Sequence, residues 1–125
     1  MICREIAVGA SRLLGNAYDE PLDFETRCSF ILAAMASETA YLDKQFREAN
    51  GLDPQPEFDY SFINLDLDFP LSDRFISAAE FYLASLLMID TDEELSDLFF
   101  ERYCDSVCSI SNSIPAKLEK TSNVY

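Results

Sequence analysis

The sequence predicts an all-α fold: a four-helix antiparallel bundle-like domain with a long second helix, an extended or short β segment near residues 58–69 and an extended C-terminal tail. Apolar residues recur at three- and four-residue steps in four separate stretches, which is the period of an amphipathic helix. Glycine and proline are scarce, at three and five residues, which disfavours a turn-rich β fold. A chain of 125 residues with 49% apolar content is long enough to form one domain with a real core.

Helices are predicted first over residues 2–14 and 23–49. The pair Gly-Asn at 15–16 ends the first helix, because either residue can take the left-handed conformation that a helix end favours. Asp23 is the expected N-cap of the second helix, and the pair Asn-Gly at 50–51 ends it. At 1.5 Å per residue the second helix spans about 40 Å.

Residues 72–89 and 92–113 are predicted to form a helical hairpin with an acidic turn between its two apolar faces. Thr91, with Glu94 three residues later, is the pattern of a capping box at the start of the last helix. Pro115 stops that helix. The sequence therefore divides into a helical domain over 1–114 and an extended arm over 115–125.

Residues 58–69, which we call the strap, follow two prolines and alternate between apolar and polar side chains. Period-two alternation predicts extended structure, and its phase changes at residues 62–63, as at a bulge, a tight turn or a break between two short pieces. The strap could be a small β element, a protruding loop that contacts a partner, or an extended segment whose aromatic side chains lie in grooves of the helices. The candidates for contacts between subunits are Phe58, Tyr60, Phe62, Leu65 and Leu67.

The net charge of −14 is concentrated in residues 51–105, and the last twenty residues carry a slight positive excess. An acidic surface repels nucleic acid phosphates, so ordinary DNA or RNA binding is disfavoured. The acidity serves either solubility or a specific function. The longest apolar stretch, at 81–89, is too short to span a bilayer, and Arg4 and Glu5 interrupt any signal peptide. We therefore expect a cytosolic product that does not enter a membrane.

Catalytic and metal-binding patterns are missing from the sequence. There is no histidine, and the three glycines are isolated, which excludes histidine-based triads in cis and a phosphate loop. Asn64, Asp66 and Asp68 open like a calcium loop, but Pro70 follows and Phe75 stands at the twelfth position. We expect no enzyme activity, no cofactor and no metal.

The four cysteines do not form a known pattern, because none of them belongs to a Cys-x-x-Cys pair. Two lie four residues apart on the last predicted helix, and the other two are far from each other, which disfavours a zinc site. We expect buried or half-buried free thiols that act as small apolar residues. They are Cys3, Cys28, Cys104 and Cys108.

Residues 69–107 resemble the small head-to-tail adaptor proteins (connector or head-completion proteins) of tailed bacteriophages. The resemblance lies in the run L-x-L-x-F-P-L-S-D-R-F at 65–75, A-A-E-F-Y-L-A-S-L-L at 78–87, D-T-D-E-E-L-S-D at 90–97 and F-E-R-Y at 100–103. In such proteins an apolar Pro-Leu run opens an Ala- and Leu-rich helix, and an acidic turn leads to a second helix. The short first helix and long second helix of this chain also suit the family.

This resemblance implies a structural virion protein that forms a homo-oligomeric ring, usually of twelve subunits, beneath the portal. One face of the ring would contact the portal protein and the other a tail or stopper protein, while DNA passes through the channel without specific binding. The place of action would be the virion neck, assembled in the cytoplasm of the host bacterium. The partner-binding residues expected in the arm, for the portal above all or for a neighbouring subunit, are Pro115, Lys117, Leu118, Lys120, Val124 and Tyr125.

An alternative from another class is an acidic inhibitor that mimics nucleic acid, such as an anti-restriction or anti-defence protein. The charge alone favours it. Against it, the acidic residues cluster at turns and helix starts rather than in long, regularly spaced rows. A regulatory or interaction domain is a third possibility. A ring under native conditions would favour the adaptor, and a monomer or dimer the mimic.

Overall fold

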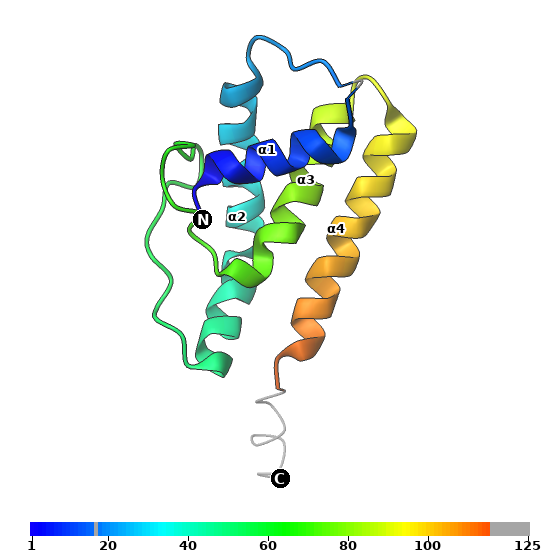
Figure 1. Ribbon diagram of the computed structural model, residues 1–125. Helices are drawn as coiled ribbons and strands as arrows, with labels where there is room; N and C mark the ends of the chain where they lie inside the picture. Colours follow the sequence, from blue (N-terminus) through cyan, green and yellow to red (C-terminus); the bar gives the residue numbers. More distant parts are fainter. Residues whose placement is uncertain (17, 116–125) are drawn as a thin grey trace.

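The computed structural model describes residues 1–16 and 18–115, and it is all-α as the sequence predicts. Over the described residues it contains four α-helices, one short 3₁₀ turn and no strand (Figure 1). The elements are α1 (Cys3–Leu14), α2 (Phe24–Asn50), η1 (Asp73–Phe75), α3 (Ile76–Met88) and α4 (Glu93–Ser113).

The third helix is the centre of the fold, since α3 packs against α1, α2 and α4. Figure 1 shows α2, α3 and α4 running along the length of the molecule, while α1 lies across them near one end. The four helix axes are therefore not all aligned. Helices α2, α3 and α4 form the bundle, and the short α1 packs across one side of it. The most extensive contact is between α3 and α4, which the predicted hairpin already joins.

The helix ends follow most of the local sequence signals, with three differences. Asp23 precedes α2 at the N-cap position as predicted, but its side chain makes no capping hydrogen bond. Gly51 ends α2 in the left-handed conformation (φ 66°), and its N–H donates to the Arg47 carbonyl oxygen. The predicted start at residue 72 becomes the 3₁₀ turn η1, so α3 itself begins at Ile76. The N-cap of α4 is Asp92, not Thr91, because the Asp92 carboxylate accepts from the Leu95 N–H at 3.0 Å.

One continuous core joins all four helices and part of the strap. Helix α2 supplies a buried stripe that includes Cys28, Leu32 and Met35, and α3 supplies its alanines and Leu83. Small residues at the centre of α3 allow its neighbours to approach closely. Buried side chains of α1 seal the crossing side, namely Cys3, Ile6, Ala7 and Ala10.

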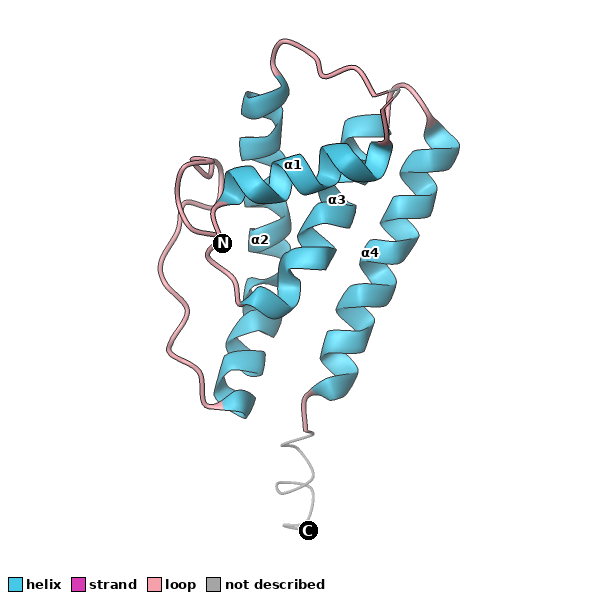
Figure 2. Cartoon of the chain, in the orientation of Figure 1, coloured by secondary structure: helices cyan, strands magenta, loops and turns pink. Residues whose placement is uncertain are grey.

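The strap was expected to be a small β element, a protruding loop or an extended segment across the helices. The structure shows an irregular segment that bends at residues 60–61 and turns at 64–67. No strand occurs in residues 58–69, and Figure 2 contains no strand colour. The nearest feature is an isolated bridge between Ile2 and Asp68. The backbone groups pair instead with the first turn of α1. The N–H groups of Cys3 and Arg4 donate to the carbonyl oxygens of Leu67 and Leu65, each at 2.9 Å.

A buried carboxylate anchors the connection between α2 and α3. Asp43 is fully buried and accepts from Arg47 Nε and Gln55 Nε2, each at 2.8 Å, and from the Ser72 N–H at 3.0 Å. Arg47 also donates to the Asp53 carbonyl oxygen. One acid therefore ties both ends of the 51–72 connection to the last turns of α2.

Among the described residues, no helix combines the length and the apolar content that crossing a bilayer requires. The arm predicted over 115–125 lies outside the described residues beyond Pro115, which is exposed after the end of α4.

Candidate functional site

A pocket of about 410 Å³ lies at the end of the molecule where α1 stops, α2 starts and the α3–α4 turn passes. Leu14 comes from the end of α1, and Leu87 and Met88 come from the last turn of α3. The remaining lining residues belong to the loop 15–23, the first turn of α2, the turn after α3 and the first turn of α4. They are Tyr18, Asp19, Pro21, Arg27, Thr91, Asp92 and Leu95.

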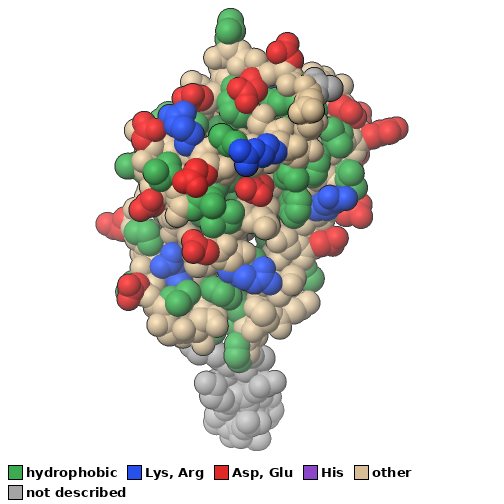
Figure 3. Space-filling view, viewed as in Figure 1, with side chains coloured by type: hydrophobic (Ala, Val, Ile, Leu, Met, Phe, Trp, Pro, Cys, Tyr) green, Lys and Arg blue, Asp and Glu red, His purple; other side chains and the backbone are tan. Residues whose placement is uncertain are grey.

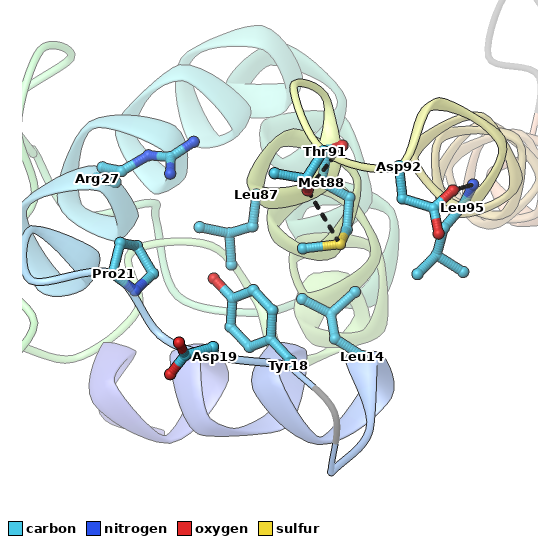
Figure 4. Close-up of a pocket in the computed structure, with 10 residues that line it drawn as sticks. All are labelled: Leu14, Tyr18, Asp19, Pro21, Arg27, Leu87, Met88, Thr91, Asp92 and Leu95. Carbon is cyan, nitrogen blue, oxygen red and sulfur yellow. Dashed lines mark hydrogen bonds between the residues drawn. The ribbon is translucent and has the colours of Figure 1, made fainter.

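The inner surface of this pocket is apolar, and its charged groups come from separate elements. Figure 4 shows the Tyr18 ring among Leu14, Leu87 and Met88. Two carboxylates, Asp19 and Asp92, and one guanidinium, that of Arg27, complete the lining. The volume falls in the range of small-molecule and cofactor sites.

The Tyr18 hydroxyl is buried and has no hydrogen-bond partner in the structure. Burial raises the pKa of this phenol, so it stays protonated and able to donate. A buried polar group without a partner costs about 1–3 kcal/mol. The oxygen is closed off from solvent, so this unsatisfied group is a local cost to the stability of the loop before α2.

The strap residues chosen from the sequence do not share one environment. Tyr60, Phe62 and Leu67 are exposed, Phe58 is half-buried, and Leu65 is buried in the core. Leu65 is therefore wrong as a contact between subunits, because its side chain packs inside the domain. The period-two alternation did not predict which of these side chains are exposed, because the backbone turns at residues 64–67 instead of staying extended.

Two exposed aromatic pairs mark the surface of the strap. Phe62 contacts Phe30 of α2 edge-to-face, with ring centroids 5.2 Å apart, and Phe58 contacts Tyr60 at 4.9 Å. Phe30 and Phe62 are 53% and 41% exposed, so their contact leaves apolar area open to solvent. Phe30 was not singled out from the sequence, although it lies outside the apolar stripe of its helix.

The calcium-like run 64–68 has a structural role. The Asn64 side-chain oxygen accepts from the Asp66 N–H at 2.8 Å, and Asp66 accepts from Arg4 of α1 at 2.9 Å. Within residues 1–16 and 18–115, no group of three or more acidic, cysteine or histidine side chains could hold a metal ion. The run is thus a turn fastened to the first helix.

The cysteines fall into two kinds. Cys3 and Cys28 are buried, and burial raises the pKa of their thiols to about 11 and about 12. Cys104 and Cys108 are exposed on α4, which corrects the expectation that all four would be at least half-buried. They share one face of the helix, but that face points away from the core.

The predicted partner residue Pro115 is exposed. The other predicted residues of the arm lie outside the described part of the chain, namely Lys117, Leu118, Lys120, Val124 and Tyr125.

No protein-family model, no curated protein and no solved structure matches the chain.

Proposed function

We propose that this chain is a structural assembly protein of the tailed-bacteriophage neck, a head-to-tail adaptor that forms a ring beneath the portal and lines the DNA channel. Its partners would be further copies of itself, the portal protein and a tail or stopper protein. It would act in the virion neck after assembly in the bacterial cytoplasm, without enzyme activity.

The observation that carries this proposal is the exposed apolar surface around the strap. Phe30, Phe62, Tyr60 and Leu67 are each at least 41% exposed, although the domain has a well-sealed core. The Phe30 and Phe62 rings touch each other and so form one joined exposed apolar area, and such areas mark contact surfaces for other proteins. A subunit of a ring needs such a surface on its flank.

The charge distribution is consistent with a DNA channel. Acidic side chains spread over the face in Figure 3, with fewer basic ones between them. A wall of negative charge repels DNA phosphates and lets the duplex pass without adhesion.

Coexpression with the portal protein encoded in the same genome tests the proposal. The expected result is co-purification of both proteins, with rings visible by negative-stain electron microscopy. Phe62→Glu should prevent ring formation because it places a charge in the exposed aromatic pair. Tyr41→Glu, about 17 Å further along α2 from Phe30, is the matched control and should leave rings intact. A chain that neither co-purifies with the portal nor forms rings beside it would rule the proposal out.

The second candidate, an acidic nucleic-acid mimic, gains one observation from the structure. Glu94, Asp97, Glu101 and Asp105 are all exposed and follow one another at three- and four-residue steps on α4. Such steps put the four carboxylates on one face of the helix, as a regular row. This row differs from the expectation that the acidic residues cluster only at turns and helix starts.

A mimic would bind a DNA-binding protein through that row and would remain a monomer or a dimer. Reversing the row with Asp97→Lys and Glu101→Lys would abolish such binding, whereas ring formation through the strap would persist. Native mass and the effect of this double variant therefore separate the two functions.

A further inference from the structure

We propose that the pocket between the ends of α1 and α3 and the start of α4 binds residues 117–120 of a second copy of this chain. Leu118 of the second copy would fill the apolar interior, and its flanking charges would meet the charged rim. This inference names a contact between the subunits of the proposed ring. The contact itself is argued from this chain alone, and only the closing of copies into a ring rests on the proposed function.

The chemistry of segment and pocket is complementary. The segment reads Lys-Leu-Glu-Lys, with one apolar side chain, two ammonium groups and one carboxylate. The pocket offers an apolar interior with the Asp19 and Asp92 carboxylates and the Arg27 guanidinium. Lysine side chains are rare in this acidic chain, and two of them stand on either side of Leu118.

The length of α4 excludes docking of this segment into its own pocket. Leu95 lines the pocket, and Ser113 ends α4 eighteen residues later, about 27 Å away along the helix axis. Leu118 is five residues beyond Ser113 and reaches at most about 18 Å from it, and Lys120 at most about 25 Å. The segment must therefore enter the pocket of another copy.

The contact that results is heterologous, because one copy contributes a pocket and the other a segment from the opposite end of α4. Contacts of this kind form closed rings when the rotation between copies closes and open chains when it does not.

Complementation between two variants tests the proposal. Met88→Lys places a cation inside the pocket, and a positive charge is favourable at the end of α3. Leu118→Asp removes the apolar side chain of the segment. Each variant alone should sediment as a monomer at concentrations where the unaltered chain forms larger species. An equimolar mixture should form one-to-one heterodimers and nothing larger, because only one intact pocket and one intact segment can meet.

Two matched controls accompany these variants. Ile89→Lys adds the same charge at the neighbouring exposed residue, which does not line the pocket. Ser122→Asp adds the same charge further along the arm. Both should assemble like the unaltered chain. Should Met88→Lys lose its helical circular dichroism, Asp19→Lys, in the loop of the pocket, takes its place in the same experiment.

A mixture that stays monomeric would overturn the inference, and so would a Met88→Lys chain that assembles as well as the unaltered one. An unaltered chain that is monomeric at all concentrations would also overturn it. If the mixture forms heterodimers but the chain does not capture the portal protein, the contact between copies is supported and the proposed function is ruled out.

Discussion

Ser85 and Ser96 join α3 to α4 by a reciprocal pair of hydrogen bonds. Each hydroxyl donates to the main-chain carbonyl oxygen of the other residue at 2.8 Å. Both side chains are buried, so the two helices meet at a point where only a small side chain fits and where its polar atom has a partner. This contact joins the end of α3 to the start of α4, next to the turn of the hairpin.

Replacing Ser96 tests that contact. Ser96→Ala should lower the free energy of unfolding by about 1 kcal/mol because it removes one hydrogen bond. Ser96→Val should cost a further 1–3 kcal/mol, roughly, because extra methyl groups do not fit between the helices. Urea denaturation followed by circular dichroism gives both values, with Ser37→Ala on the exposed face of α2 as the control. Equal stability of the Ala and Val variants would contradict close packing here.

Asp43 is expected to be the most sensitive polar residue of the domain. Asp43→Ala removes the acceptor for Arg47, Gln55 and the Ser72 N–H, and it leaves the guanidinium of Arg47 without its carboxylate. Breaking a buried ion pair from one side costs about 3–5 kcal/mol. Hydrogen exchange should also quicken across residues 52–72, which the carboxylate fastens to α2. Lys44→Ala, at the exposed neighbouring residue, should change neither quantity.

The start of α4 distinguishes the observed N-cap from the predicted capping box. Asp92→Ala should destabilise the domain by about 1 kcal/mol, because the Leu95 N–H loses its acceptor. Thr91→Ala should cost less, since the Thr91 hydroxyl caps no helix N–H and reaches Met88 at long distances, its carbonyl oxygen at 3.5 Å and its sulfur at 3.7 Å. Thermal melting of the two variants measures the difference. If Thr91→Ala lowers the melting temperature more than Asp92→Ala does, the predicted capping box at Thr91 is supported and the Asp92 cap is contradicted.

Glu80 should make stability depend on pH in a defined direction. Its half-buried carboxyl lies against Gly9 of α1, and burial raises its pKa above the ordinary value of 4.5. The folded state therefore binds this proton more tightly than the unfolded state, and the resulting stability is lost as the pH rises through the raised pKa.

Glu80→Gln should consequently have a higher melting temperature than the unaltered chain at neutral pH. This difference in melting temperature should disappear below pH 4.5. Glu101→Gln, exposed on α4, is the control for loss of one negative charge from an acidic protein. If the melting temperature rises equally in both variants at neutral pH, the cause is reduced charge repulsion across the whole protein and not the burial of Glu80.

The helices could be predicted from the sequence because their signals are local. Four apolar stripes and the glycines at 15 and 51 place the four helices to within a few residues, with η1 replacing the first turn predicted for the third. The N-cap was misplaced by one residue because the sequence offers both Thr91 and Asp92, and only the backbone geometry decides between them.

The pocket and the buried acid could not be predicted, because both depend on contacts between distant segments. The pocket lining runs from Leu14 to Leu95, and no local pattern links these residues. Asp43 and Arg47 did carry a signal, since opposite charges four residues apart face each other on a helix. The sequence does not reveal that this pair is buried, because burial follows from the way 51–72 folds back over it.

The pairing of the strap with α1 has a consequence for the order of events during synthesis. The first helix has twelve residues, and a helix that short is marginal alone in water. The acceptors for the N–H groups of its first turn are the carbonyl oxygens of Leu65 and Leu67, more than sixty residues later. At about 5–20 residues per second, the ribosome needs several seconds to supply them. During that interval the apolar face of the first helix has no partner, and chaperones that hold nascent chains would meet this protein there first.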